Sequence, residues 1–204
     1  MVERTAPPRP GWAALIMLLL LAGMWMLELL DQLSGNQLDQ LGIHARDFDG
    51  MPEILSAPFL HAGWDHLMSN SLPFLVLGFL VLLSGLARWL IASLIIIVIS
   101  GLTAWFLTPA NTIILGASGL IFGWLTYLLA RGVWSRRPAQ VVIAVLVLLV
   151  YGGLIWGVFP SGAGISWQAH LGGAIAGVLA AWLLHRRASR QAVPAAQIRR
   201  YPSY

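Results

Sequence analysis

The chain has 204 residues, of which 58% are hydrophobic and only 10% are charged, and its mean hydropathy is +0.78. So little polar surface cannot cover a water-soluble globule, which excludes the soluble enzymes and indicates an all-α bundle of membrane-spanning helices. The sequence contains no cysteine, which excludes disulfides and thiolate zinc sites.

Six apolar segments divide the chain, and each is a candidate for a helix in the bilayer. A hydrocarbon core of about 30 Å needs roughly 20 apolar residues per helix. The segments are Trp12–Leu30, Leu67–Leu83, Trp89–Leu107, Ser118–Ala130, Val141–Phe159 and Ala169–Leu184. We expect one six-helix membrane domain over residues 12–185, with an N-terminal tail of residues 1–11 and a basic C-terminal tail of residues 186–204.

The arginines predict the orientation of these helices. If the chain crosses the membrane at every segment, eleven of its twelve basic residues lie on one side and only Arg46 lies opposite. Arginine is in excess in cytoplasmic loops, so both termini are predicted to be cytoplasmic, and we expect a bacterial plasma membrane. The pI near 10.3 is then a sign of topology, and no nucleic-acid partner is expected.

Two regions differ from plain spanning helices. The first outer loop, from Asp31 to Asp65, contains the apolar run Ile54 to Leu60. Such backbone is tolerated at membrane depth only where protein covers it, so we expect a partly embedded loop on the flank of the bundle.

In the fourth segment only Leu120 to Ala130 is unbroken before Arg131. A helix of that length ends below the outer surface, so Ser118 is expected in a water-accessible recess.

A serine nucleophile is the first candidate for chemistry. The tetrapeptide Gly116-Ala117-Ser118-Gly119 places Ser118 at the start of the fourth segment. Free N–H groups and the positive end of a helix dipole suit the oxyanion of acyl transfer. Gly116 and Gly119 are expected to let a substrate backbone approach closely. Small residues also serve helix packing, however, and the tetrapeptide alone favours that interpretation.

His170, at the start of the sixth segment, is the candidate base for Ser118, because a serine nucleophile needs a base within hydrogen-bond reach. The two segments carry GxxxG motifs formed by Gly119 and Gly123, and by Gly173 and Gly177. Close contact of these faces would bring the two side chains together. No acidic residue accompanies them, so a dyad is expected rather than a triad, with the histidine oriented by packing. The alternative is an interfacial histidine bonded to a loop carbonyl.

His66 and Asn70 lie four residues apart on the second segment and therefore share one helix face. Side chains of these types can donate to an oxyanion, although Asn70 can instead hold helices together. His61 and His66 lie five residues apart and form no HExxH motif, so neither a metal site nor a cofactor is expected.

Three stretches together resemble the rhomboid family of intramembrane serine proteases. They are His61-Ala-Gly-Trp-Asp-His66-Leu-Met-Ser-Asn70, Gly116-Ala-Ser118-Gly119 and Ala169-His170-Leu-Gly-Gly173-Ala-Ile-Ala-Gly177. They occur in the family's order, within a match from Asp47 to Leu184. The resemblance implies a six-helix core with Ser118 as nucleophile and His170 as general base.

The resemblance also assigns the remaining site residues. It implies an oxyanion hole formed by the Ser118 N–H and the side chains of His66 and Asn70. It implies that His61 is a structural or water-handling residue near the site. It further implies that Val141–Ser161 controls the lateral entry of substrate.

Two positions depart from the family pattern. The family often has a Trp-Arg pair early in the first loop, where this chain has Met51-Pro52-Glu53. It also often has a tyrosine four residues after the serine, where this chain has Phe122. A phenylalanine can stack on the histidine but cannot donate a hydrogen bond.

The expected function is that of an intramembrane serine endopeptidase that cleaves transmembrane protein substrates near the outer face of the bilayer. One alternative is a non-catalytic rhomboid-like protein that binds membrane clients, although Ser118 and His170 are both present. The other is a small transporter, in which intramembrane polar residues line a pathway. Polar residues of this kind do not continue along the helices to the predicted cytoplasmic side.

Overall fold

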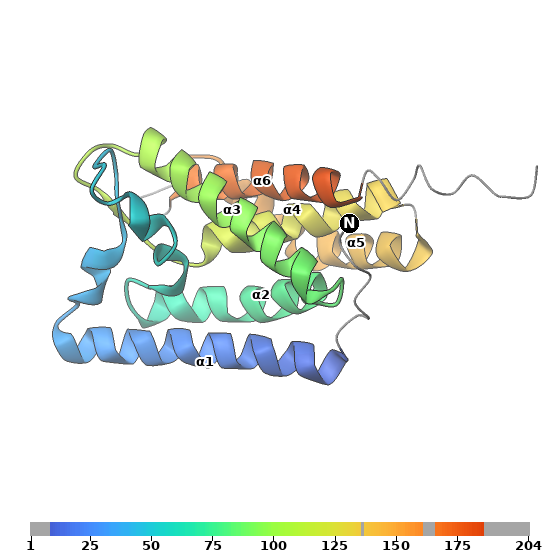
Figure 1. Cartoon of the computed structure of the whole chain (residues 1–204), viewed down its shortest axis with the longest axis horizontal. Coiled ribbons are helices and arrows are strands. Elements are labelled where there is room, and N and C mark those ends of the chain that lie inside the picture. The colour runs from blue at the N-terminus through green and yellow to red at the C-terminus, as the bar shows by residue number, and fades with distance from the viewer. Residues whose placement is uncertain (1–8, 136, 161–165, 186–204) are drawn as a thin grey trace, which may run out of the picture.

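The computed structural model describes residues 9–135, 137–160 and 166–185. In these residues the helices run alongside one another (Figure 1). They are α1 (Pro10–Ser34), α2 (Trp64–Leu82), α3 (Leu86–Leu107), α4 (Ser118–Ser135), α5 (Pro138–Tyr151) and α6 (Trp167–His185). Five spans are long and apolar enough to cross a membrane: α1, α2, α3, residues Pro138–Val158 and α6. The predicted all-α membrane bundle is confirmed.

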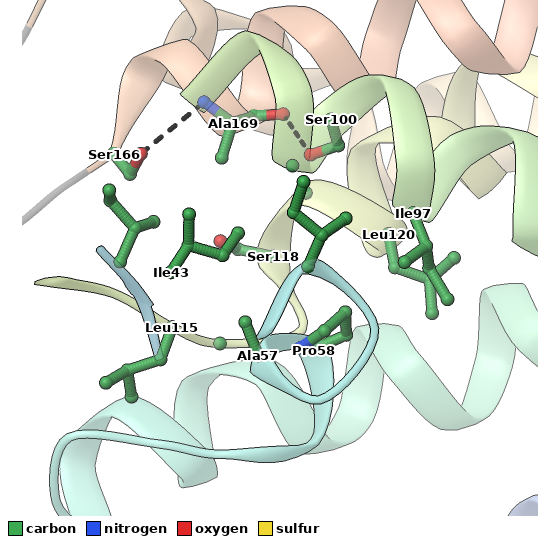
Figure 2. A pocket seen from close by; sticks show the side chains of 15 residues that line it. Ile43, Ala57, Pro58, Ile97, Ser100, Leu115, Ser118, Leu120, Ser166 and Ala169 are labelled. Carbon is green, nitrogen blue, oxygen red and sulfur yellow. Dashed lines mark hydrogen bonds between the residues drawn. The ribbon is translucent and has the colours of Figure 1, made fainter. Parts of the chain in front are cut away.

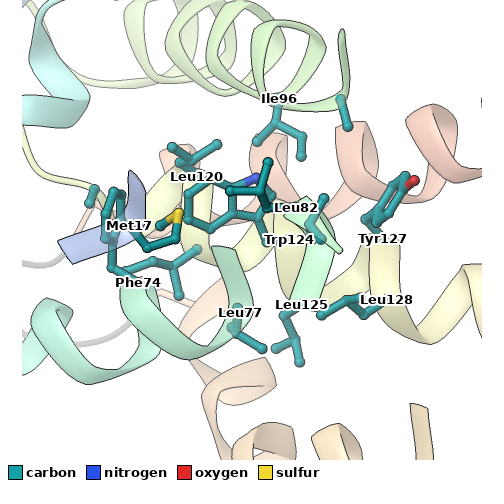
Figure 3. Close-up of a cluster of buried hydrophobic side chains, with 14 of the residues drawn as sticks. Met17, Phe74, Leu77, Leu82, Ile96, Leu120, Trp124, Leu125, Tyr127 and Leu128 are labelled. Carbon is teal, nitrogen blue, oxygen red and sulfur yellow. The ribbon is translucent and has the colours of Figure 1, made fainter. Parts of the chain in front are cut away.

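Helix α4 is the centre of the bundle and contacts α2, α3, α5 and α6. Trp124 of this helix is fully buried, between Phe74 at a ring-centroid distance of 5.2 Å and Trp89 at 6.0 Å (Figure 3). Its indole Nε1–H donates to the Ser93 hydroxyl at 3.0 Å, so the buried polar atom is satisfied. Close packing of this kind holds helices together in lipid, where no hydrophobic force drives them to associate.

Glycines allow α4 and α6 to approach at backbone distance. A side chain on Gly173 would collide with the carbonyl oxygen of Gly119, and one on Gly177 with that of Gly123. The hydroxyl of Thr126 adds a hydrogen bond of 2.8 Å to a carbonyl of α6. The two GxxxG motifs therefore bring these helices together, as the sequence analysis expects.

The structure corrects the ends of two predicted segments. Helix α4 continues past Arg131 to Ser135, and the Arg131 side chain is stabilised there by a hydrogen bond of 2.9 Å from its Nε to Gln140. The predicted segment Val141–Phe159 is divided into α5 and a 3₁₀ turn, η4 (Gly152–Val158). The start of α4 is nevertheless set back from the loop ends of α1 and α3 (Figure 1).

The first loop packs on the bundle through short elements. These are the 3₁₀ turns η1 (Leu38–Leu41), η2 (Met51–Ile54) and η3 (Ala57–Phe59) and the strand β1 (Ile43–His44). Strand β1 pairs antiparallel with β2 (Ile113–Ile114), with Ile43 opposite Ile114. The apolar side chains of the loop form a buried cluster with Ala104 of α3 and Ala169 of α6. This agrees with the predicted packing of the loop on the flank.

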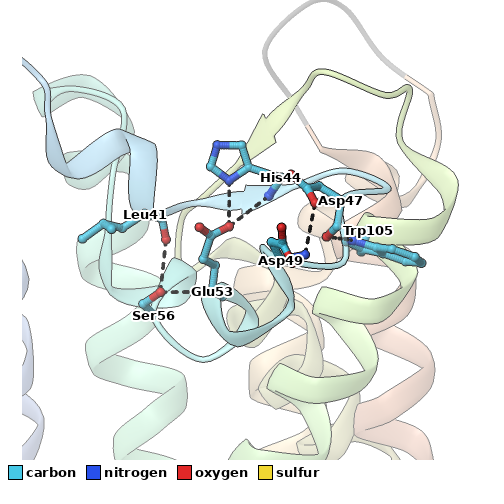
Figure 4. Close-up of polar contacts among 7 residues, drawn as sticks. All are labelled: Leu41, His44, Asp47, Asp49, Glu53, Ser56 and Trp105. Carbon is cyan, nitrogen blue, oxygen red and sulfur yellow. Dashed lines mark hydrogen bonds and ion pairs between the residues drawn. The ribbon is translucent and has the colours of Figure 1, made fainter.

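Polar contacts fix the outer part of the same loop (Figure 4). One oxygen of the Glu53 carboxylate accepts the backbone N–H of His44 at 3.3 Å and lies 2.7 Å from Nδ1 of its ring. The indole of Trp105 in α3 donates to the carbonyl of Asp47 at 2.8 Å. The segment Met51-Pro52-Glu53, which departs from the family pattern, thus still supplies an anchor through Glu53.

Candidate active site

Ser118 is the first residue of α4, and the three residues Leu115, Gly116 and Ala117 connect it to the paired strand β2. Gly116 adopts a φ of +117°, and its N–H donates to the carbonyl of Ala57 in the first loop at 2.9 Å. The first intrahelical bond runs from the N–H of Ile121 to the carbonyl of Ala117 at 2.9 Å. The N–H groups of Ser118 and its two successors therefore have no acceptor within the helix. The loop and the helix start together place a nucleophile beside free donors.

His170 lies in the first turn of α6 with its ring between two oxygen atoms. Its Nε2 is 2.8 Å from Oγ of Ser118, and its Nδ1 is 2.9 Å from the carbonyl oxygen of Gly157. A carbonyl only accepts, so Nδ1 carries the proton and Nε2 is left to accept the serine hydroxyl. This is the tautomer that a general base for Ser118 requires.

The orienting group of His170 was not identified from the sequence. The sequence analysis expected packing to orient this ring, and packing does contribute, because the Phe122 ring stacks on it at a centroid distance of 4.1 Å and an angle of 6°. The hydrogen bond comes from the backbone of Gly157 in η4, and a backbone carbonyl has no sequence signature. A bond from His170 to a loop carbonyl appears in the sequence analysis only as the alternative to a catalytic role, whereas the structure shows such a bond together with the contact to Ser118.

His66 lies against the segment that leads to Ser118. A Cβ on Gly116 would lie 2.5 Å from Cε1 of the His66 ring, so this position needs glycine for space as well as for its positive φ. The structure therefore places the His66 ring beside Gly116, two residues before Ser118.

Asn70 is buried one helical turn further along the same face, with 6% of its surface exposed. Its Nδ2 donates to the carbonyl of His66 at 2.9 Å. A side-chain amide carries two N–H groups, so this bond leaves the second one for another acceptor. The arrangement ties Asn70 to the backbone that carries His66.

His61 supports the turn before the nucleophile. Its buried Nε2 accepts the N–H of Ala117 in a long hydrogen bond of 3.5 Å, and its ring lies 5.1 Å from that of His66. Within the described residues its Nδ1 has no partner. Burial, and then the charge of His66, lower the pKa of His61 to about 3. His61 is therefore a neutral residue at physiological pH that buttresses Ala117.

A recess borders Ser118 on the side of α3. It is lined by the first loop, by Ser100 and Gly101 of α3, by the segment before Ser118, and by Ser166 and Ala169 at the start of α6 (Figure 2). Its volume of about 30 Å³ is enough for a water molecule. Gly119 keeps this region open toward α3, because a side chain there would collide with the Ser100 hydroxyl. Ser118 thus has free space beside it as well as a base.

Comparison with known proteins agrees with this arrangement. A rhomboid domain matches residues 49–187 of the chain. The chain belongs to the rhomboid family. The match contains η2, η3 and all of α2 to α6, and with them Ser118, His170 and His66.

The relatives of this rhomboid protein include bacterial and plant proteins. An uncharacterized protein of Mycobacterium tuberculosis (strain ATCC 25618 / H37Rv) is 46% identical over 186 residues, which cover 86% of this chain and 78% of that protein. One from Mycobacterium leprae is 42% identical over 172 residues, covering 80% and 68%. Rhomboid-like protein 11, chloroplastic, of Arabidopsis thaliana is 29% identical over 158 residues, covering 69% and 55%. The mycobacterial relatives fit an integral membrane protein of bacterial type.

Proposed function

We propose that this rhomboid protein is an intramembrane serine endopeptidase that hydrolyses peptide bonds of transmembrane substrate proteins. One observation carries the proposal: Oγ of Ser118 lies 2.8 Å from Nε2 of His170 while the Gly157 carbonyl holds the opposite nitrogen of that ring. A chance contact between a serine and a histidine would not also fix the tautomer that makes the histidine a base.

The first half of the reaction forms an acyl-enzyme. Oγ of Ser118 attacks the carbonyl carbon of the scissile bond as its proton passes to Nε2 of His170. The resulting oxyanion accepts hydrogen bonds from the Ser118 N–H and from the side chains of His66 and Asn70. Collapse of this intermediate breaks the C–N bond, and His170 returns the proton to the leaving amine.

The second half hydrolyses the ester on Ser118. A water molecule from the neighbouring recess gives a proton to His170 and attacks the acyl carbon, which releases the new carboxyl end and restores the serine hydroxyl. The recess has the volume for such a water. The imidazolium that forms in each half is stabilised by the Gly157 carbonyl at Nδ1, in the place of a triad carboxylate.

Substrate is proposed to enter laterally past α5, as the resemblance to the family implies. Only 6% of the span Pro138–Val158 is buried inside the protein, so most of this helix faces lipid. Ser161, at the end of the predicted gate, lies outside the described residues. Both termini are proposed to be cytoplasmic, with the site open to the outer side of a bacterial plasma membrane.

The test combines covalent labelling with cleavage on the purified full chain. We expect a fluorophosphonate probe to label the wild type at Ser118 and a transmembrane test substrate to be cut. The Ser118→Ala and His170→Ala variants should lose both signals while they remain folded, because the pair acts as one unit.

Matched controls lie in the same helices. Ser166→Ala removes another serine of the same recess, and His185→Gln changes a histidine at the far end of α6; both variants should remain active. Substantial cleavage by Ser118→Ala would refute the mechanism. A folded wild type that binds membrane clients but is neither labelled nor able to cut them would establish the non-catalytic alternative instead.

A further inference from the structure

Among the described residues, four basic groups lie at the end of the bundle opposite the first loop. They are Arg88 in the first turn of α3, Arg131 near the end of α4, Arg137 at the start of α5 and His185 at the end of α6. Figure 1 shows α3 and α5 starting, and α4 and α6 ending, at this same end. The three arginines are here called the arginine cluster. Hydrogen bonds join the elements that carry these groups: Arg131 of α4 donates to Gln140 of α5 at 2.9 Å, and the hydroxyl of Tyr127 on α4 lies 2.9 Å from Nε2 of His185.

The described part of the chain offers the arginine cluster no carboxylate. The sequence has 8 acidic residues, and none of them follows Asp65. Within the described residues the one ion pair joins His44 and Glu53, in the first loop at the opposite end. Glu3 lies outside the described residues. The positive charge of the cluster is therefore not neutralised by any described part of the protein.

The contacts that the arginines make orient them without removing charge. Nε of Arg131 donates to the neutral side chain of Gln140 at 2.9 Å, and a guanidinium nitrogen of Arg88 donates to the carbonyl of Ser84 at 2.9 Å. Arg137 caps α5, whose N-terminal end adds further positive potential. Like charges held this close repel one another unless an anion lies between them.

The surroundings of the cluster identify the kind of anion. Exposed apolar side chains adjoin it on three helices: Leu90 on α3, Val133 on α4, and Val141 and Val142 on α5. The indole Nε1 of Trp89, next to Arg88, is buried and has no partner within the described residues. Tryptophan is typical of the depth where lipid headgroups meet acyl chains. An anion at this place needs an apolar tail as well as a charged head.

We propose that the arginine cluster binds the phosphodiester headgroup of an anionic phospholipid, with the acyl chains against the neighbouring apolar surface. Guanidinium groups bind phosphate oxygens in pairs, and basic pockets between helix ends bind lipid headgroups in other membrane proteins. A bound lipid connects the end of α4 with the start of α5, because Arg131 lies in α4 and Arg137 directly precedes α5. The proposal does not depend on the proposed proteolysis.

The test measures lipid adducts on the full chain in detergent by native mass spectrometry, with phosphatidylglycerol and phosphatidylcholine as probes. We expect phosphatidylglycerol to bind the wild type at least tenfold more tightly. The variant Arg88→Gln/Arg131→Gln/Arg137→Gln should lose this preference. The control Arg190→Gln/Arg199→Gln/Arg200→Gln removes the same charge from the C-terminal tail and should keep it.

Three results would overturn the proposal: an unchanged preference in the cluster variant, an equal loss in the tail control, or equal binding of the two lipids by the wild type. Displacement of phosphatidylglycerol by millimolar inorganic phosphate would assign the site to free phosphate and also overturn it. If the triple variant does not fold, Arg88→Gln serves instead, because Arg88 bonds only a carbonyl one turn away. That single variant should weaken phosphatidylglycerol binding severalfold.

Discussion

The carbonyl oxygen of Gly157 lies 2.9 Å from Nδ1 of His170, so a backbone group occupies the place that a carboxylate takes in a Ser-His-Asp triad. Gly157 belongs to η4, which follows the lipid-facing helix α5. The geometry of the proposed base is therefore coupled to the segment through which substrate is proposed to enter.

Gly157→Ala tests this coupling. A Cβ at this position would lie 2.7 Å from Cζ of Phe122 and 3.3 Å from Nδ1 of His170, so the stacked pair must shift. A misplacement of about 1 Å can lower turnover roughly 10²-fold, and we expect a fall in kcat of that order. The measurement is kcat together with the melting temperature. Normal turnover in this variant would show that the Gly157 carbonyl does not orient the base.

Asn70→Ala separates an oxyanion role from a packing role. Donors aimed at a charge that exists only in the transition state affect turnover more than substrate affinity, and removal of one typically lowers kcat about 10²–10³-fold. We expect that loss for Asn70→Ala and a similar one for His66→Ala, with little change in substrate binding. An unstable Asn70→Ala protein with full turnover per folded molecule would assign Asn70 to packing instead.

Gly173→Ala tests the close approach of α4 and α6. The new methyl group would collide with the backbone of Gly119, which cannot move aside as a flexible side chain does. Overpacking of this kind destabilises by about 1–3 kcal/mol, and it should also separate Ser118 from His170. Thermal unfolding in detergent and kcat provide the two measurements. Gly23→Ala in α1, where nothing lies within 4 Å, is the control and should leave both values unchanged.

Glu53→Ala tests the anchor of the first loop. The change removes the acceptor of both the backbone N–H and the ring of His44, and each such bond contributes about 1 kcal/mol. Because β1 pairs with the strand before Ser118, we expect a lower melting temperature and a lower kcat. Asp49→Asn, at an exposed position of the same loop, is the comparison. Equal effects of the two changes would mean that the loop has no specific anchor at Glu53.

Reporter fusions test the proposed orientation. The arginine distribution predicts a cytoplasmic reporter after Arg137 and after Arg187, and an external reporter after Asp49. Arg187 lies outside the described residues, so the fusion supplies information that the fold does not. An external reporter after Arg187 would remove the six-crossing topology.

The helices could be predicted from the sequence because their signal is local. The length of the apolar runs predicts all six segments, and the spacing of the glycines predicts the contact between α4 and α6. The helix ends are predicted less accurately: the fourth segment is expected to end at Ala130, whereas α4 continues to Ser135 and Arg131 bonds Gln140. The identity of a charged residue does not show which hydrogen-bond partner stabilises it inside a helix.

Only the site residues that act through their side chains could be predicted from the sequence. The sequence predicts Ser118, His170 and His66 as site residues; in the fold Ser118 and His170 lie within hydrogen-bond distance, and the His66 ring lies beside Gly116. The Gly157 carbonyl was missed, as were the pairing of β1 with β2 and the contact of Glu53 with His44. Each depends on a backbone atom or on segments far apart in the chain, and apolar periodicity carries no information about either.

The pairing of Ile43 with Ile114 restricts how chimeras of this protein with its relatives can be designed. Side chains alternate between the two faces of a strand, so a shift of one residue in β1 would turn the buried Ile43 outward and bring its neighbour His44 inward. The first loop and the segment that ends at Ser118 therefore have to be exchanged together. A chimera that takes either from a relative must take both, in the same register.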